Sequence, residues 1–197
     1  MKPQQFDKLA NEAFGGVLAP AGFSNDKSRY CTFYREVSDG FYHIVMPDLG
    51  TRGAWYDVKV FAYSSCLTPR FEEIFPDDLG IPTDIFCHLG SSGIGPDPME
   101  FNCKNEENFR RRFTSTVAPL LESVAIPYLE QFQTLNDLLP EIRSPLSKAL
   151  ATHYVLGREA GHALLEQQRE RLGAIDSDHA KVVATLQLID ELLSPPA

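Results

Sequence analysis

The chain has 197 residues, of which 43% are hydrophobic and 23% charged, enough for one folded domain with or without a helical extension. Its net charge of −9 repels phosphate backbones and anionic lipids, so we expect neither nucleic acid nor membrane as a partner. No apolar signal segment, no stretch near ~18 continuous apolar residues and no CxxC pair among the four cysteines is present. These features predict a cytoplasmic protein with reduced thiols.

The first half of the chain predicts one helix followed by strands. Residues 4–19 have helical apolar spacing, and Pro20 and Gly22 end that helix. Strands are then expected at about 29–36, 41–47, 54–64 and 83–89. Ser38-Asp39-Gly40 is typical of a tight hairpin, and the connections among the first three strands are too short for a crossover helix. The sheet should therefore be antiparallel.

The periodicity changes from two to about 3.6 near Asn105, which is a good N-cap for a helix running towards Leu135. Pro119 and Pro127 predict a kink or a break in it. Its expected apolar stripe is Phe109, Phe113, Val117, Leu121, Val124, Tyr128 and Phe132.

Two further helices are predicted, over residues 145–172 and 178–193, as an antiparallel hairpin. Gly157 and Gly161 lie four apart on the first of them, a spacing that lets another helix approach closely. The fold class is thus α+β: a mostly antiparallel sheet of about four strands flanked by helices, with a C-terminal helical hairpin. We expect an α+β domain over residues 1–140 and the hairpin over 141–197 packed on it as one structural unit.

The sequence holds no convincing metal site. Cys87, His88 and Cys103 supply too few ligands for a structural zinc site, and adjacent residues on a strand point to opposite faces. Glu159 and His162 have the spacing of a di-iron helix, but the chain has no second such pair. We expect these residues to serve strand packing and a solvated helix face.

Nor does a pattern for catalysis emerge. The glycine-rich loop 90–95 lacks the lysine of a phosphate-binding loop, and residues 24–27 lack the partner motifs of a Ser-x-x-Lys enzyme. Lys104 and the arginines at 110–112 form one basic cluster, expected on a solvated helix face or beside an acidic partner or the chain's own carboxylates. We predict no catalytic residue, no metal and no cofactor.

The third predicted strand carries the strongest functional signal, because one face combines aromatic side chains with opposite charges. The candidate partner-binding residues are Trp55, Asp57, Lys59, Phe61 and Tyr63, with His43 and Val45 on the same side of the neighbouring strand if the register allows. Acidic residues at 72–73, 77–78 and 97 would supply a rim. Either this face is an exposed recognition surface or a helix covers it.

The order of these motifs resembles a known bacterial family. A helix ending in Pro20-x-Gly22-Phe23 precedes Tyr30-x-x-Phe33-Tyr34-Arg35, the strand FYHIV and the helix segment IPYLEQF. Over about residues 4–140 this resembles the domain-of-unknown-function family four-three-zero-four. The resemblance implies a small α+β domain without an established reaction, and similar small proteins occur among immunity proteins of bacterial toxin systems.

We therefore expect a non-enzymatic protein-binding domain, most narrowly an acidic immunity-type protein that occludes a basic toxin. Acidic groups would steer the partner, and aromatic side chains would anchor it. Two alternatives stay open. One is an enzyme or small-molecule site between the sheet and the helix at 105–133, using His43, His88, Asp57 and Arg35. The other is a homodimeric scaffold that associates through the C-terminal hairpin.

Overall fold

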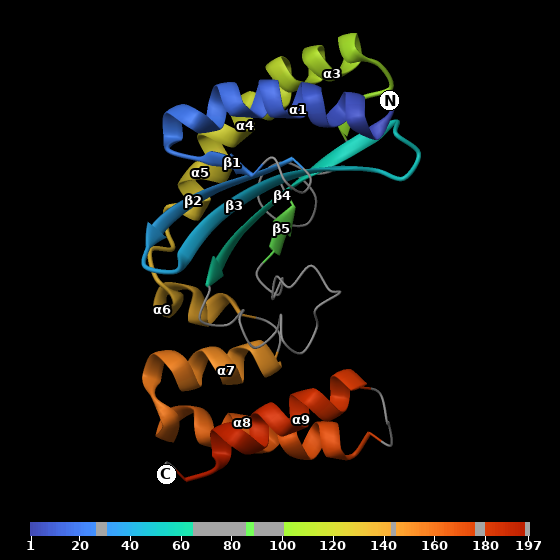
Figure 1. Cartoon of the computed structure of the whole chain (residues 1–197). Helices are drawn as coiled ribbons and strands as arrows, with labels where there is room; N and C mark the ends of the chain where they lie inside the picture. The colour runs from blue at the N-terminus through green and yellow to red at the C-terminus, as the bar shows by residue number, and fades with distance from the viewer. Residues whose placement is uncertain (27–30, 65–85, 89–100, 143–144, 176–179, 196–197) are drawn as a thin grey trace. The chain divides into compact units, whose positions relative to one another are not determined.

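The computed structural model of the chain is shown in Figure 1. It describes residues 1–26, 31–64, 86–88, 101–142, 145–175 and 180–195. The chain forms two compact units. Unit 1 comprises Met1–Tyr63 and Phe86–Gln133, and unit 2 comprises Ser64–Ile85 and Thr134–Ala197. Within the described stretches, no helix is long and apolar enough to cross a membrane.

Unit 1 is built on a six-stranded sheet with the order β1-β2-β3-β4-β5, and β6 also pairs with β4. Its strands are β1 (Ser24–Asp26), β2 (Thr32–Ser38), β3 (Phe41–Leu49), β4 (Trp55–Ser64), β5 (Phe86–His88) and β6 (Phe101–Asn102). The pairs β1–β2, β2–β3, β4–β5 and β4–β6 are antiparallel. The predicted α+β fold is confirmed, and the short strands β1 and β6 extend the predicted sheet.

The hairpin between β2 and β3 forms where the sequence predicted it. Gly40 has a φ of 67°, a conformation that glycine adopts without the steric cost of a Cβ atom. Its N–H donates to Oε1 of Glu36 at 3.2 Å. The register shifts between Glu36 and Ser38, so a bulge lies beside the turn.

Helix α1 (Pro3–Leu18) continues into the 3₁₀ turn η1 (Ala19–Ala21) and ends at Gly22, whose φ of 84° is a left-handed cap. Its fully buried residues are Phe6, Leu9, Ala10, Phe14 and Leu18. The helix therefore presents one apolar stripe to the sheet.

A second helical segment, here called the helical run, extends without a break from Glu106 to Leu129. It consists of α3 (Glu106–Arg112), η4 (Phe113–Val117), α4 (Ala118–Leu120), η5 (Leu121–Ala125) and α5 (Ile126–Leu129), of which η4 and η5 are π-helical turns. The side chain of Asn105 caps it by accepting from the N–H of Asn108 at 2.8 Å, as predicted. A π turn precedes each of Pro119 and Pro127. These wider turns accommodate the ring and the missing N–H of proline without a break.

The π turns also decide which side chains of the helical run are buried. The buried residues recur every four positions: Phe109, Phe113, Val117, Leu121, Ala125 and Leu129. In a pure α-helix, four residues advance by roughly 400°, so such a row would drift ~40° at each step. The wider π turns cancel this drift. Beyond Leu121 the predicted stripe followed α-helical spacing. It is wrong at Val124 and Tyr128, which are only partly buried, whereas Phe132 is buried as predicted.

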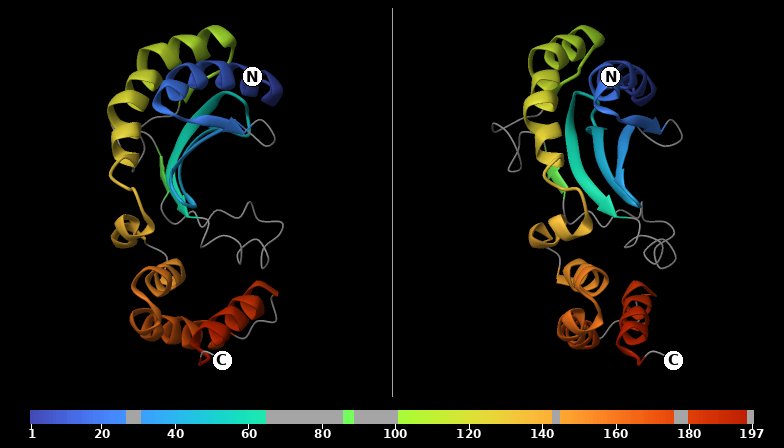
Figure 2. Two further views of the ribbon diagram at one scale, coloured as in Figure 1. Left: turned by 60° about the vertical axis from the view of Figure 1, so that its left-hand side comes forward. Right: turned by 90° about the vertical axis from the view of Figure 1, so that its left-hand side faces the viewer.

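Tyr56 lies at the centre of the core that joins the sheet to its helices. Its ring centroid is 5.2 Å from that of Phe6 on α1, 5.3 Å from Phe101 on β6 and 5.4 Å from Phe109 on the helical run. Figure 2 shows α1 and the helical run on the same side of the sheet. One hydrophobic core thus lies between that side of the sheet and both helices.

Unit 2 is helical in its described part. It consists of α6 (Leu135–Leu138), the 3₁₀ turn η6 (Leu139–Glu141), α7 (Pro145–Leu156), α8 (Arg158–Gly173) and α9 (Ala180–Leu193). Arg158 Nη2 donates to the carbonyl oxygen of Leu193 at 2.7 Å and so links α8 to α9. A C-terminal helical hairpin is confirmed, but α7 and α8, which the sequence predicted as one helix over 145–172, form it. Its packing on the sheet domain stays a prediction.

The predicted helix over 145–172 is wrong in one respect, because Gly157 divides it into α7 and α8. Gly157 has a φ of 90° and a ψ of 170°, a conformation open essentially to glycine alone. Gly161 allows the close approach that the spacing predicted. A Cβ atom on Gly161 would lie 2.6 Å from the Cα atom of His153 on α7.

Candidate functional site

Strand β4 has two chemically different sides, because alternate side chains of a strand point to opposite faces. On one side, Tyr56, Val58 and Val60 are fully buried in the core beneath the helices. The alternate residues of β4 are Trp55, Asp57, Lys59 and Phe61. They therefore lie on the side of the sheet away from α1 and the helical run.

The strand register extends this second side across the sheet. The core residues Phe33 and Val45 pair with each other, and their neighbours Tyr34 and Ile44 also pair. Even-numbered residues of β2 and β3 therefore share a side with odd-numbered residues of β4. We call this side the outer face; its members are Tyr34, Glu36, Tyr42, Ile44, Met46, Asp48, Trp55, Asp57, Lys59 and Phe61.

The side chains of the outer face differ in their exposure to solvent. Tyr34 is 38% exposed, and Glu36 and Asp48 are also exposed. Half-buried members are Tyr42, Met46, Trp55, Asp57 and Lys59. Ile44 and Phe61 are buried, with 8% and 1% exposed. The outer face thus consists of buried apolar residues surrounded by aromatic and charged side chains that reach solvent.

Charge on the outer face is predominantly negative. Its three carboxylates belong to Glu36, Asp48 and Asp57, and Lys59 is its one cation. The Lys59 ammonium pairs with Oδ2 of Asp48 at 2.5 Å. Desolvation, and then the carboxylates of Glu36 and Asp39, raise the pKa of Tyr42. A hydrogen bond between the Tyr42 phenol and the Glu36 carboxylate contributes to this rise in pKa, so the phenol donates within the outer face.

The structure brings together only part of the predicted partner-binding set. Trp55, Asp57 and Lys59 share the outer face and are accessible in part. Phe61 lies on the same side but is 1% exposed, so it supports the surface from below. The side chain of Tyr63, like the acidic residues at 72–73, 77–78 and 97, lies outside the described residues.

The prediction that His43 lies beside Trp55 on one side of the sheet is wrong. His43 is 0% exposed, and Val45, two residues further along β3, belongs to the core on the opposite side. The register that the sequence left open decides this, since a shift of one residue exchanges the faces. Tyr34 follows Phe33 and Tyr42 precedes His43, so each tyrosine lies on the face opposite its buried neighbour. This alternation in the sequence would have identified the outer residues of β2 and β3.

His43 instead joins a buried polar network. Its Nε2 lies 2.6 Å from the carbonyl oxygen of Phe132, and its Nδ1 lies 3.0 Å from Nη2 of Arg35. Because a guanidinium only donates, Nδ1 accepts and the Nε2–H donates, so the imidazole is neutral. Burial lowers the pKa of His43 more than its hydrogen bond to Phe132 raises it.

Arg35 connects this network to the N-terminal segment. Its Nη1 donates to the carbonyl oxygen of Ala21 at 2.9 Å, and its guanidinium carbon lies 4.8 Å from the ring centre of Phe23. The Glu130 carboxylate lies 3.8 Å away. These contacts place Arg35 and His43 in a structural role.

The alternative small-molecule site at these residues is not assembled in the part of the chain that the structure describes. Arg35 and His43 meet, but Asp57 lies on the outer face, across the sheet from them. The side chain of His88 lies outside the described residues.

The remaining candidates for chemistry lie apart from one another. Burial raises the pKa of Cys31 to about 12 and that of Cys103 to about 11, so both thiols stay protonated and unreactive at neutral pH. Among the residues described, no three potential metal ligands form a group. His162 lies 3.4 Å from Glu166 on the exposed side of α8. The side chain of Cys87 and the loop 90–95 lie outside the described residues.

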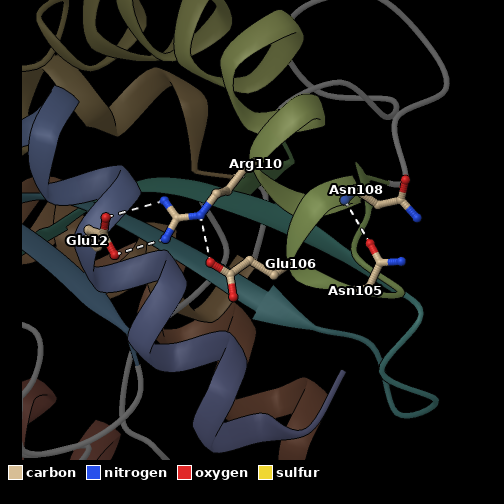
Figure 3. A network of polar contacts seen from close by, with 5 residues as sticks. All are labelled: Glu12, Asn105, Glu106, Asn108 and Arg110. Carbon is tan, nitrogen blue, oxygen red and sulfur yellow. Dashed lines mark hydrogen bonds and ion pairs between the residues drawn. The ribbon is translucent and has the colours of Figure 1, made fainter.

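The basic cluster divides between two environments. Arg110 is held by the chain's own carboxylates, one of the outcomes that the sequence left open. Figure 3 shows its guanidinium between Glu12 of α1 and Glu106 of α3. The distances are 3.3 Å to Oε2 of Glu12 and 2.9 Å to Oε1 of Glu106. The Nη2 group of Arg111 donates instead to Oδ1 of Asn108 at 2.7 Å.

Accessible aromatic rings beside carboxylates are suited to recognition of a basic surface rather than to bond-making chemistry. No family model, curated protein or solved structure matches this chain. The functional argument therefore depends on the geometry and the charge of the outer face.

Proposed function

We propose that this chain is a non-enzymatic protein-binding domain whose binding surface is the outer face. More narrowly, we propose an immunity-type protein of the bacterial cytoplasm that neutralises a basic toxin by tight binding. One observation carries the proposal: three accessible aromatic residues lie among three carboxylates. These residues are Tyr34, Tyr42 and Trp55, with Glu36, Asp48 and Asp57.

Each class of side chain has its own part in this mechanism. The net charge of −9 and the carboxylates of the outer face attract a basic partner and raise its association rate. Tyrosine and tryptophan rings bury a large area at a low entropic cost and so anchor the complex. The partner is inhibited because the bound domain covers its functional surface.

Affinity capture with a matched pair of tyrosine variants tests the proposal. Tyr34 on the outer face is 38% exposed and Tyr154 in unit 2 is 41% exposed, so neither substitution should disturb a core. The tagged full chain should capture a basic protein in stoichiometric amount from a lysate of its own cells. Higher salt should release part of it. Tyr34→Ala should lose the partner, whereas Tyr154→Ala should keep it.

Growth of cells that express the captured protein supplies the functional readout. Co-expression of the wild-type chain should restore growth, and the Tyr34→Ala variant should not. A partner held equally well by Tyr34→Ala contradicts the assignment of the outer face. Capture of no protein at either salt contradicts the immunity role.

A homodimeric scaffold is a second candidate, and one observation favours it. Four of the exposed large hydrophobic residues described lie in unit 2: Tyr154, Leu156, Ile175 and Val183. Leu156 is 57% exposed. Exposed apolar surface is unfavourable in water, and a second copy of the chain could bury it. Light scattering after size exclusion should then give a mass that rises with concentration, and Leu156→Gln should reduce that rise. A constant monomer mass contradicts this candidate.

A further inference from the structure

A cavity of about 420 Å³ opens on unit 1. Its described lining residues are Asn102, Asn108, Arg111, Arg112 and Ser115. Asn102 belongs to β6, and the other four belong to the helical run. All five are polar, and none is a carboxylate. The volume is within the range of small-molecule sites, roughly 300–1,000 Å³.

The amide oxygens of both lining asparagines are already hydrogen-bonded within the protein. The Oδ1 atom of Asn108 accepts from Nη2 of Arg111 at 2.7 Å. The Oδ1 atom of Asn102 accepts from the backbone N–H of Lys104 at 3.2 Å. Since each amide oxygen is already bound to a donor of the protein, each Nδ2 group remains to donate to a ligand.

The two arginines of the cavity, Arg111 and Arg112, differ from their neighbour Arg110 in their ion pairing. Arg110 is neutralised by Glu12 and Glu106 (Figure 3). Within the described part of the chain, neither Arg111 nor Arg112 forms an ion pair. The Nη1 atom of Arg112 lies 3.5 Å from Oγ1 of Thr116. The described lining of the cavity is therefore cationic and rich in hydrogen-bond donors, on a chain that is acidic as a whole.

We propose that this cavity binds the phosphate group of a small phosphorylated molecule. Guanidinium groups match the oxygen spacing of phosphate and bind it through paired, charge-assisted hydrogen bonds. Amide and hydroxyl donors from Asn102, Asn108 and Ser115 complete a shell for the remaining phosphate oxygens. The volume beyond one phosphate group leaves room for the organic part of the ligand.

Nuclear magnetic resonance titration of the full chain with inorganic phosphate tests this site, at an ionic strength held constant with sodium chloride. The side-chain Nδ2 resonances of Asn102 and Asn108 should shift and saturate. Arg111→Gln and Arg112→Gln should each weaken phosphate affinity about tenfold, as expected for one lost charge-assisted contact. Arg171→Gln, the same charge change at an exposed position on α8, should leave the affinity unchanged.

Three results would overturn the proposal. The asparagine resonances of the wild-type chain could shift without saturating, or shift equally with chloride alone. The Arg111→Gln/Arg112→Gln double variant, with its circular dichroism intact, could bind phosphate as tightly as the wild type. Acetate could bind as tightly as phosphate, which would make the site a carboxylate site. The wild-type titration decides the matter even where the double variant fails to fold.

Discussion

The imidazole of His43 donates a 2.6 Å hydrogen bond to the carbonyl oxygen of Phe132, although the two residues are 89 positions apart in the chain. The bond joins β3 to the segment that follows the helical run. Its geometry requires the neutral imidazole, because the other ring nitrogen accepts from Arg35. Protonation of His43 would remove that acceptor and place a second cation beside the guanidinium.

Unit 1 should therefore lose stability as the pH falls below about 6.5. The ordinary pKa of histidine is 6.5, and burial lowers the pKa of His43 in the folded chain. Between the lowered value and 6.5, the unfolded chain binds a proton that the folded chain does not, so a falling pH favours unfolding. The contribution of His43 is complete above pH 6.5. Urea unfolding followed by fluorescence of Trp55, the single tryptophan, measures it.

Two variants separate His43 from His153, a second histidine whose pKa is lowered. Burial, and then the charge of Arg158, lower the pKa of His153 in unit 2. His153 should therefore also make the folded chain less stable as the pH falls. His43→Gln keeps a donor for Phe132 but cannot titrate, so its Trp55 transition should change less between pH 7 and pH 5. His153→Gln should leave that transition as pH-dependent as in the wild type. A wild-type transition that is constant over this range contradicts the role given to His43.

Two glycines of α8 should respond oppositely to alanine. A Cβ atom on Gly161 would lie 2.6 Å from Cα of His153, so Gly161→Ala must move α7 away and should cost about 1–3 kcal/mol. Gly173 has no atom within 4 Å of its Cβ position. Gly173→Ala should therefore stabilise the helix by about 0.4–1 kcal/mol. Thermal unfolding followed by circular dichroism at 222 nm compares them, and equal effects would refute the close helix contact.

Structural features that depend on a few adjacent residues could be predicted from the sequence. The turn at Gly40 and the N-cap at Asn105 depend on a few adjacent residues, and both form as expected. The break at Gly157 could not be predicted, because most helical glycines keep α-helical dihedrals and only the φ of 90° makes this one a boundary. The fold class was predicted from the spacing of apolar residues along whole strands and helices. One misplaced helix boundary does not change that prediction.

The candidate site was predicted less completely, because it depends on the pairing of strands distant in sequence. Alternation along β4 correctly separated Trp55 from Tyr56, since that needs one strand alone. The side on which His43 lies depends on the β2–β3 and β3–β4 registers, which a single sequence does not fix. The arginines at 111 and 112 were grouped with Arg110 for the same reason, since the position of α1 decides which of them meets Glu12.

A matched pair of leucine substitutions tests the π-helical register of the helical run. Ala125 is fully buried and has no room for three more carbon atoms, so Ala125→Leu should cost about 1–3 kcal/mol. Val124 is only partly buried, and Val124→Leu should change stability by less than about 0.5 kcal/mol. Urea unfolding followed by Trp55 fluorescence gives both values. The reverse order would indicate α-helical spacing and would exclude the π turn before Pro127.

Phe61 and Tyr34 share the outer face but should differ in what they contribute. Phe61 is 1% exposed, so Phe61→Ala should leave a cavity and destabilise unit 1 by about 3–5 kcal/mol. Tyr34 is 38% exposed, so Tyr34→Ala should change stability by less than about 1 kcal/mol while it removes a binding anchor. Urea unfolding measures the first effect, and affinity for the captured partner measures the second. If Phe61→Ala keeps full stability but loses the partner, Phe61 is itself an anchor, and the outer face opens when the complex forms.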